Sequence, residues 1–289
     1  MAISAEQVKK LRDQTGAGMM ECKNALTEAN GDFEEANTIL RKRGLASAAK
    51  KAGRTANEGL IASAVAPDHS FGILAEVNCE SDFVARTPDF VQLMAQVVAA
   101  IEKAGDGATD VWLKDPNGPI AALVAPVIAK LGENMAVSRF SRFAGHGFVG
   151  QYIHLGGKLG VQVEFGGVTP AVASREEFVT LVKEIAMQIA AAGPSYVSRE
   201  SVPAELLEKE KAIYRAQMEN SGKPANVIDK IVEGKLGAYY AQSVLPDQAS
   251  IRDPKMTVKD VLAAANKALG ATVSITRFAR VKVGEAPSA

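Results

Sequence analysis

The chain contains two copies of one segment, and this internal repeat constrains the fold more than any other feature of the sequence. Residues 59–105 recur at 147–193, and the offset of 88 positions stays constant from the first glycine of each copy to the last. Two copies of one unit share one packing problem, so we expect two related subdomains with similar cores. The positions that are identical in both copies include Gly72, Glu76, Val84, Ala85, Phe90, Val91, Leu93, Ile101 and Ala104.

A second match extends the repeat toward the carboxyl terminus. Residues 131–142 and 269–280 share a Leu-Gly pair and an Arg-Phe-x-Arg sequence at an offset of 138, so the second copy has gained 50 residues before residue 269. These residues contain two apolar helical patterns on either side of Asn220-Ser221-Gly222-Lys223-Pro224, which is a strong chain break. We expect a helical hairpin, inserted at about 200–249, that projects from the body. Its apolar face either closes on itself or pairs with a second copy of the chain as a coiled coil, which would make a homo-dimer.

Each copy has the pattern of a β-hairpin followed by a helix. In copy one, short apolar runs at 60–65 and 71–77 flank the turn sequence Pro67-Asp68-His69-Ser70, and helical spacing follows at 90–101. In copy two the corresponding runs lie at 148–155 and 161–165, with a helix at 176–192. A further helix and a closing strand follow in both copies and end at Phe143 and near Val283. The expected fold class is α+β, with antiparallel sheets that carry helices on one side.

The first 45 residues have the pattern of three short helices. Ser4 and Gln7 form a capping box, and Gly16 lies in the segment that breaks the first helix. Asp32 caps the third helix, and Gly44 is expected to end it. We therefore predict a helical domain at 1–45, a linker at 46–58, a first core subdomain at 59–143, a second at 144–283 with its inserted hairpin, and a short tail at 284–289.

The composition excludes several classes of function. The net charge is zero, which gives no overall attraction to nucleic acid or to an anionic membrane. Cys22 and Cys79 are far apart and lack the spacing of a metal or redox site, as is typical of a reducing, intracellular setting. No apolar run approaches the roughly 20 residues of a membrane span, and the amino terminus has no signal or transit pattern. We therefore expect a cytoplasmic protein that does not act on a membrane.

One basic run interrupts this even distribution of charge. It contains no acidic residue and consists of Arg41, Lys42, Arg43, Lys50, Lys51 and Arg54. The run is either a solvated helix end and tether or a contact for an acidic partner or RNA. We favour the first interpretation, so nucleic acid is not an expected partner.

Only one segment imitates a cofactor motif. Residues 145–150, Gly-His-Gly-Phe-Val-Gly, have the spacing of a dinucleotide fingerprint, but that loop functions only between a strand and a helix. Here the following residues 152–155 are strand-like, and the repeat aligns the loop with the start of a strand in copy one. P-loop, nucleophile-elbow and zinc-protease sequences do not occur. We expect no cofactor, no bound metal and no enzymatic activity.

The two copies differ most in the six residues before their helices. Copy one has Asn78-Cys79-Glu80-Ser81-Asp82-Phe83, and copy two has Gly166-Gly167-Val168-Thr169-Pro170-Ala171. Because copy two makes the same turn without an acid or a large aromatic residue, the scaffold does not require Asp82 and Phe83. Two interpretations are open. Either Asp82 satisfies a turn amide and Phe83 packs on its own helix, or the pair forms a binding tip with an exposed aromatic anchor.

These residues resemble the elongation factor Ts family, and the resemblance covers nearly the whole chain. Residues 11–26, Leu-Arg-Asp-Gln-Thr-Gly-Ala-Gly-Met-Met-Glu-Cys-Lys-Asn-Ala-Leu, are similar to the amino-terminal signature of the family. A second signature is matched by Asn78, Cys79, Glu80, Ser81, Asp82, Phe83, Val84, Ala85 and Arg86, although the family more often has threonine where Ser81 stands. The resemblance also implies a ubiquitin-associated-like (UBA-like) helical domain at the amino terminus, two related core subdomains and a protruding coiled-coil hairpin.

The resemblance implies a guanine nucleotide exchange factor for elongation factor Tu, the GTPase that delivers aminoacyl-tRNA to the ribosome in protein biosynthesis. Asp82 and Phe83 would enter the nucleotide-binding domain of that partner near its magnesium site, with Phe83 as a wedge between side chains. The residues implied to hold the same domain are Arg12, Met19, Met20, Lys23 and His154. Ile251 and Arg252 match the segment that meets another surface of the partner, although both differ from the usual family pattern. The alternative is a scaffold that binds a GTPase or another protein without driving nucleotide release.

Overall fold

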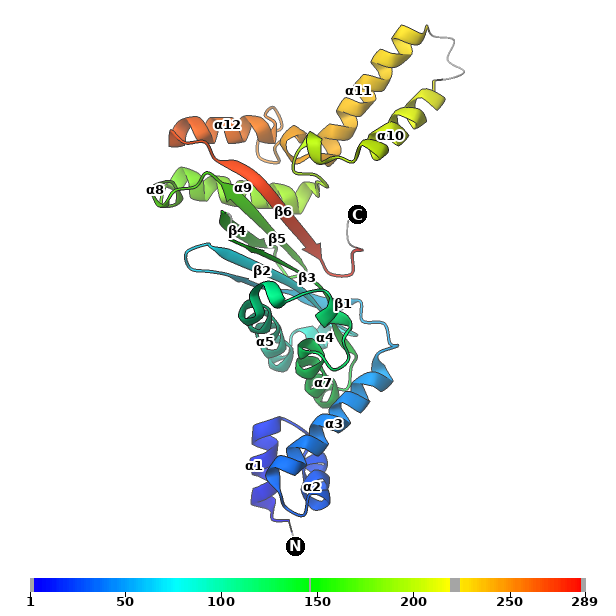
Figure 1. The fold of residues 1–289 in the computed structure, drawn as a ribbon, viewed down its shortest axis with the longest axis vertical. Helices are drawn as coiled ribbons and strands as arrows, with labels where there is room; N and C mark the ends of the chain where they lie inside the picture. The colour runs from blue at the N-terminus through cyan, green and yellow to red at the C-terminus, as the bar shows by residue number, and fades with distance from the viewer. Residues whose placement is uncertain (1–2, 146, 219–223, 287–289) are drawn as a thin grey trace.

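The computed structural model describes residues 3–145, 147–218 and 224–286. Figure 1 shows three helices at one end, a core of sheets and helices in the middle, and a two-helix arm at the other end. Both sheets are antiparallel and three-stranded, and helices cover them, so the predicted α+β class is confirmed.

The amino-terminal helices are α1 (Ala5–Thr15), α2 (Met19–Glu28) and α3 (Phe33–Lys51). The predicted capping box at the start of α1 is present, because the Gln7 amide donates to the Ser4 hydroxyl and the Ser4 amide donates to the Gln7 side chain. The side chains that the three helices bury against one another include Leu11, Cys22, Leu26, Ala36 and Ile39.

Helix α3 is longer than the sequence predicted. We expected it to end at Gly44 and a linker to begin at residue 46, but the helix continues to Lys51. Gly44 is buried where α3 crosses helix α7 (Pro119–Leu131), and an added Cβ there would lie 3.6 Å from the carbonyl oxygen of Ala125. The glycine therefore permits a close helix crossing instead of ending the helix, and the linker prediction is wrong for residues 46–51.

The two sheets repeat one register. The first consists of β1 (Glu58–Val65), β2 (Phe71–Cys79) and β3 (Met135–Ala144), and the second of β4 (Phe148–Ile153), β5 (Leu159–Gly166) and β6 (Ser274–Lys282). Val77 faces Val137 in the first sheet, and the equivalent Phe165 faces Ile275 in the second. A register shift occurs immediately before this pair in both sheets. The repeat in the sequence is thus a repeat in the backbone as well.

Each sheet carries two long helices on its outer face. Helices α5 (Pro88–Ala104) and α7 cover the first sheet, and α9 (Glu176–Ala192) and α12 (Val258–Leu269) cover the second. The short elements are α4 (Asp82–Ala85), α6 (Val111–Lys114), α8 (Pro170–Ala173), and the 3-10 turns η1 (Gly105–Gly107), η2 (Arg199–Ser201) and η3 (Leu245–Asp247).

The inner faces of the two sheets pack against each other, which the sequence analysis did not predict. An added Cβ on Gly72 would lie 2.6 Å from Val149, and one on the equivalent Gly160 would lie 2.7 Å from Ile61. Val149 and Ile61 are themselves separated by the repeat offset of 88. Both glycines are therefore required because one sheet approaches the other too closely for a side chain.

Backbone hydrogen bonds between the sheets follow the same reciprocity. The Ile61 amide donates to the Gly157 carbonyl at 2.8 Å, and the Val149 amide donates to the His69 carbonyl at 2.9 Å. Each residue of one bond is 88 positions from its counterpart in the other. The core is thus a pseudo-symmetric pair in which the same surface of each copy contacts the other copy.

The insertion in the second copy forms helices α10 (Ala204–Ala216) and α11 (Ala225–Ser243), which project from the core. Arg215 pairs with Asp229 at 3.1 Å, and Lys235 lies over the Tyr214 ring at 5.3 Å, so contacts between the two helices hold the arm together. The predicted chain break at 220–224 falls outside the described residues except for Pro224, which is the N-cap of α11.

Candidate partner-binding surface

Asp82 and Phe83 lie in the short helix α4, so the turn expected before the long helix is itself helical. The Ser81 hydroxyl caps this helix by accepting from the Val84 amide at 3.4 Å. In copy two, Thr169 caps α8 in the same way by accepting from the Val172 amide at 3.3 Å. The capped turn is therefore shared scaffold, and the difference between the copies is confined to the side chains that the turn displays.

Phe83 is an exposed aromatic residue. Its exposure is 80%, whereas Phe90, on the next helix, is completely buried. Of the two interpretations left open by the sequence, packing of Phe83 in its own core is thus wrong. Asp82 beside it keeps 42% of its side chain exposed and pairs with Arg86 at 2.9 Å. Such a surface ion pair contributes little to stability, so a partner can replace it at low cost.

The first residues of the 78–86 motif hold the backbone that leads into α4. Asn78 is buried, donates to the Glu76 carboxylate at 2.9 Å and accepts from the Ser138 hydroxyl at 2.5 Å. The thiol of Cys79 is buried and donates to the Ser81 carbonyl at 3.0 Å. Burial raises the pKa of Cys79 to about 11, so this thiol is a packed structural group and not a nucleophile.

The remaining motif residues complete the same support. The Glu80 carboxylate accepts from the Asn134 amide at 2.6 Å. Val84 and Ala85 pack into the core of the first copy. The motif therefore has two parts, because most of its side chains fix the turn while Asp82, Phe83 and Arg86 face the solvent.

A second exposed group lies on the amino-terminal helices. Arg12 is in the last turn of α1, and Met19, Met20 and Lys23 occupy the first half of α2, with all four exposed. Met19 and Met20 have exposures of 46% and 63%. Flexible, polarizable side chains of this kind adapt to apolar partner surfaces.

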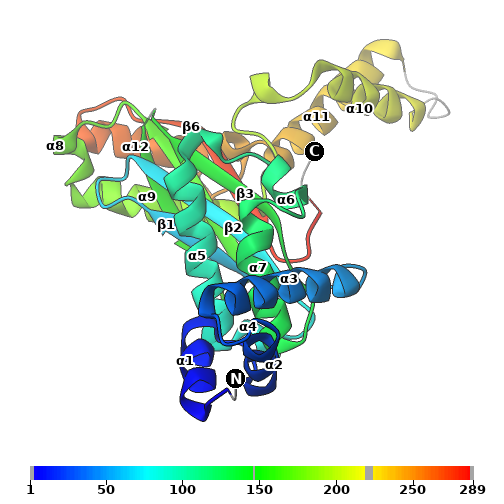
Figure 2. The same cartoon turned by 60° about the horizontal axis from the view of Figure 1, so that its bottom comes forward.

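Contacts across the core bring these helices close to α4. Gly16, between α1 and α2, lies against Lys130 at the end of α7, since an added Cβ would be 3.6 Å from its ammonium nitrogen. Lys130 in turn donates to Asp89 at 2.6 Å, in the first turn of α5, the helix that follows α4. Figures 1 and 2 show α4 and α7 on the side of the core that faces the three amino-terminal helices. The two exposed groups therefore share one end of the molecule.

His154 reaches the same end from the second copy. It is exposed in the turn between β4 and β5, and its Nδ1 lies 2.9 Å from the Tyr152 hydroxyl. Lys158 in this turn pairs with Glu58 at 2.5 Å, and Glu58 faces Cys79 in the sheet register. The turn thus lies beside the strand ends from which α4 emerges.

Ile251 and Arg252 form a separate group. They lie between η3 and α12, where the Ile251 amide donates to Gln188 at 2.8 Å and Arg252 pairs with Glu184. Both partners are on α9, which covers the outer face of the second sheet. Ile251 has an exposure of 46%. The structure does not bring these two residues next to α4.

The structure also decides the competing motifs. Residues 148–150 form the start of strand β4, so the dinucleotide fingerprint leads into a strand and lacks the helix that it requires. In the basic run, Arg43 pairs with Glu28 at 2.6 Å and Lys51 donates to the Ile128 carbonyl at 3.3 Å. The run is therefore engaged in part by the protein itself. In the part of the chain that the structure describes, no helix is both long and apolar enough to cross a membrane.

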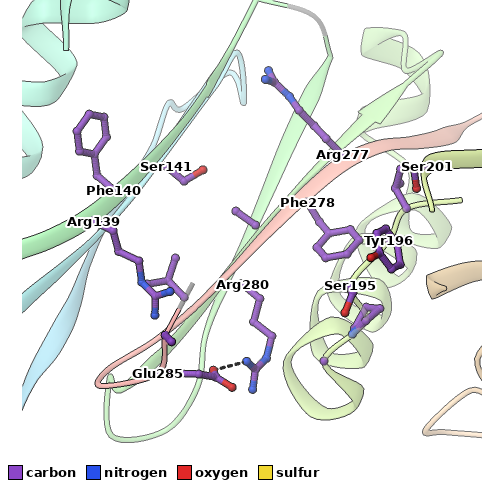
Figure 3. Close-up of a pocket in the computed structure, with 16 residues that line it drawn as sticks. Arg139, Phe140, Ser141, Ser195, Tyr196, Ser201, Arg277, Phe278, Arg280 and Glu285 are labelled. Atoms are coloured by element: carbon purple, nitrogen blue, oxygen red, sulfur yellow. Dashed lines mark hydrogen bonds and ion pairs between the residues drawn. The ribbon is translucent and has the colours of Figure 1, made fainter. Parts of the chain in front are cut away.

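A groove of about 670 Å³ is lined by residues of β3, β6 and the segment that follows α9 (Figure 3). Three arginines line it, and each already has a carboxylate partner. Arg139 donates to Glu76 at 2.8 Å, and Arg280 to Glu285 at 2.6 Å. In the second copy, Arg277 pairs at 2.8 Å with Glu164, which is the residue equivalent to Glu76. The three arginines that line the groove are thus neutralised by internal ion pairs, and the α4 end remains the candidate site.

Known proteins resemble this chain along almost all of its length. The family profile described as Elongation factor TS matches residues 80–285. The chain belongs to the elongation factor Ts family. Elongation factor Ts of Aquifex aeolicus is 43% identical over 294 residues, which cover 98% of this chain and 99% of the relative. Elongation factor Ts of Nitratiruptor is 44% identical over 293 residues, and that of Trichlorobacter lovleyi 42% over 291, each covering 99% of this chain and 94% of the relative.

Membership of the family confirms the resemblance drawn from the two signatures. The profile match begins at Glu80 and includes α4 with both of its displayed side chains. It also includes the inserted arm and the segment that carries Ile251 and Arg252. Residues 11–26 precede the profile match, but the aligned relatives extend over them because they cover 98–99% of the chain.

Proposed function

We propose that this chain is a guanine nucleotide exchange factor for elongation factor Tu and acts in the cytoplasm during translation elongation. The observation that carries the proposal is the display of Phe83, 80% exposed beside Asp82, on a capped turn that the second copy builds without either residue. A folded protein gains nothing in stability from a solvent-exposed aromatic ring. Its benefit must come from a surface that it contacts, and aromatic anchors contribute strongly to protein interfaces.

The mechanism rests on competition for the phosphate and magnesium site of the partner. A GTPase holds GDP through backbone amides around the phosphates and through a bridging Mg²⁺. Helix α4 enters the nucleotide-binding domain near this site, and Phe83 acts as a wedge between side chains. Because binding linkage is reciprocal, a factor that binds better when these elements are displaced weakens the bound nucleotide by the same factor. No covalent bond changes, so the process needs no catalytic residue in this chain.

The other exposed residues supply the remaining contacts in this proposal. Four residues of the amino-terminal helices hold the same partner domain, and these are Arg12, Met19, Met20 and Lys23. His154 adds to this surface, and Ile251 with Arg252 meets another surface of the partner. Support comes from the shared end of the molecule for the first group and from the exposure of Ile251 for the second. Each tenfold acceleration of release requires a barrier lower by ~1.4 kcal/mol, so several contacts must act together.

The proposed architecture follows the predicted domains. Helices α1 to α3 form the UBA-like domain, the two sheet-and-helix units form the core subdomains, and α10 with α11 forms a coiled-coil arm. The pseudo-symmetric packing of Gly72 and Gly160 supports the division of the core. The short connection at 52–57 then becomes the only non-helical linker between the first domain and the core.

A second candidate function is a scaffold that binds the GTPase without driving nucleotide release. The exposed pair Met19 and Met20 favours it, because an adaptable apolar surface would support binding with or without exchange. Mixing the protein with elongation factor Tu that carries a fluorescent GDP analogue separates the two. An exchange factor accelerates the loss of fluorescence in the presence of excess unlabelled GDP, at concentrations well below those of the GTPase. A scaffold co-purifies with the GTPase and leaves the release rate unchanged.

A further inference from the structure

Helix α4 is held from outside by a residue that neither signature contains. The carboxylate of Glu133 accepts from the Ser81 amide at 2.9 Å and from the Ser81 hydroxyl at 2.6 Å. We infer that Glu133 is a positioning residue for nucleotide exchange, which fixes the orientation in which α4 presents Phe83. The inference rests on the proposed function and concerns the same site.

A helix of four residues needs such support. A single turn fixes several backbone dihedrals for very few hydrogen bonds, so a helix this short is not stable by itself. Ser81 is its N-cap, and both of the polar groups of Ser81 that can donate are engaged by one carboxylate. A charge-assisted pair of hydrogen bonds at a helix start is stronger than neutral ones, and the negative charge there also suits the helix dipole.

A second carboxylate bridges the same two segments in the opposite direction. Glu80 accepts from the Asn134 amide at 2.6 Å, and the Asn134 side chain donates to the Arg54 carbonyl at 2.7 Å. Residues 80–81 and 133–134 are thus joined by carboxylates from both sides. Glu133 itself is placed by Gly132, which ends α7 in the left-handed conformation at φ 81°.

The second copy of the repeat shows that the scaffold does not need this carboxylate. At the offset of 138, Glu133 corresponds to Ala271, between α12 and β6. Thr169 still caps α8 there, and the strand register around it is the same. Glu133 therefore occurs in the same copy as Asp82 and Phe83, and its counterpart is absent where theirs are absent. This distribution is expected of a group that serves the displayed side chains and not the fold.

The physical effect is preorganisation. If α4 became ordered only when the partner binds, this ordering would cost conformational entropy. That cost would raise the barrier to nucleotide release. A turn already fixed at Ser81 presents Phe83 in one orientation, and that cost is met during folding. Removal of the carboxylate is therefore expected to change the rate of exchange more than the stability of the protein.

The test uses Glu133→Ala, with Glu177→Ala as the matched control because Glu177 is a carboxylate at the start of a helix in copy two. In the free protein, hydrogen exchange at the Ser81 amide is expected to accelerate about tenfold or more in Glu133→Ala and to stay unchanged in the control. Glu133→Gln retains one acceptor oxygen but no charge and is expected to restore part of the protection. Unchanged Ser81 exchange in Glu133→Ala would overturn the inference before any partner is added.

The second measurement is a double-mutant cycle on GDP release from elongation factor Tu. Glu133→Ala alone is expected to slow exchange about five- to tenfold, with Glu133→Gln between this variant and the parent protein. In a Phe83→Ala background the same substitution is expected to have a much smaller effect, because the main side chain that Glu133 positions is gone. Fully additive losses would overturn the inference. If Phe83→Ala alone leaves release unchanged, the proposed function fails instead, and a Phe83 effect with a silent Glu133→Ala overturns only the positioning role.

Discussion

Replacing Phe83 by alanine tests the function of the exposed turn most directly. A phenylalanine side chain offers on the order of 200 Å² of surface, and with an exposure of 80% roughly 160 Å² of it remains to be buried in a partner. At about 25 cal/mol per Å² this area corresponds to ~4 kcal/mol, and alanine retains part of it. We therefore expect a loss of about 2–3 kcal/mol in the transition state for release, or a roughly 30- to 160-fold slower exchange.

Stopped-flow release of a fluorescent GDP analogue from elongation factor Tu measures this loss. The binding of the nucleotide-free partner, followed by calorimetry, is expected to weaken much less than the exchange rate falls. The melting temperature of the variant should stay within about 1–2 °C of the parent protein, because substitutions of exposed side chains change stability by about 0.5 kcal/mol or less.

A control variant separates the aromatic ring from its location. Ala171→Phe places an aromatic residue at the equivalent position of copy two, and in a Phe83→Ala background it is expected not to restore exchange. A less than threefold slowing in a folded Phe83→Ala protein would refute the reasoning. Equal losses in exchange rate and in affinity for the nucleotide-free partner would favour the scaffold function.

Three other perturbations probe the rest of the surface and the scaffold. Met20→Ser removes an apolar side chain that is 63% exposed, and we expect about tenfold weaker binding of nucleotide-free elongation factor Tu by calorimetry; unchanged affinity would remove α2 from the interface. Gly160→Val places a side chain where even a Cβ would be 2.7 Å from Ile61, so the unfolding free energy in urea should fall by about 2 kcal/mol or more, and an unaltered midpoint would contradict the close packing of the sheets. Burial raises the pKa of Cys79 from 9.0 to about 11, so the native thiol should react with a disulfide reagent far more slowly than in denaturant at pH 8. Because the folded pKa is the higher one, its contribution to stability is complete below about pH 9 and is lost between pH 9 and 11, which urea unfolding at the two pH values measures.

The elements that the sequence predicted well are those with a local signal. The helix expected at 176–192 is observed with the same limits, because a glycine follows its last residue in the left-handed conformation and its apolar residues keep helical spacing. The strand pairs were also predictable, since short apolar runs flank turns of polar residues or glycine. The end of α3 was not, because Gly44 looks like a stop signal in sequence and becomes a packing residue only when α7 lies across it.

The packing of the two sheets depends on contacts between residues far apart in the chain, and no local pattern predicts those. Two signals were nevertheless present. Gly72 and Gly160 are identical across the repeat, and β2 buries successive residues, Ile73, Leu74 and Ala75, instead of alternate ones. Continuous burial is typical of a strand that is covered on both faces. Because helices cover only one side of each sheet, burial of both faces requires a second covering layer. The other sheet provides it.

The sequence identified candidate residues for the site but not their geometry. Comparison of the copies shows that Phe83 is dispensable for the turn, yet the side chain could still have packed inward, and only its position on α4 decides that it is exposed. Glu133 was missed because it is 52 residues from Ser81 in the chain. The sequence did contain a signal for Glu133. In the match between residues 131–142 and 269–280, Glu133 aligns with Ala271 and thus differs between the copies.

The duplication separates stability from function in a way that can be stated residue by residue. Copy one has three acidic residues in or beside α4, and these are Glu80, Asp82 and Glu133. At the equivalent positions copy two has Val168, Pro170 and Ala271. The substitutions leave the cap, the strand register and the sheet-to-sheet contacts the same in both copies, so these acids are not required by the fold. Glu80 and Glu133 fix the backbone around the start of α4, and Asp82 lies beside the exposed Phe83, at one edge of a body whose two halves otherwise support each other. Change at this edge is therefore expected to alter nucleotide release, whereas change at the shared glycines and core residues alters release only by unfolding the protein.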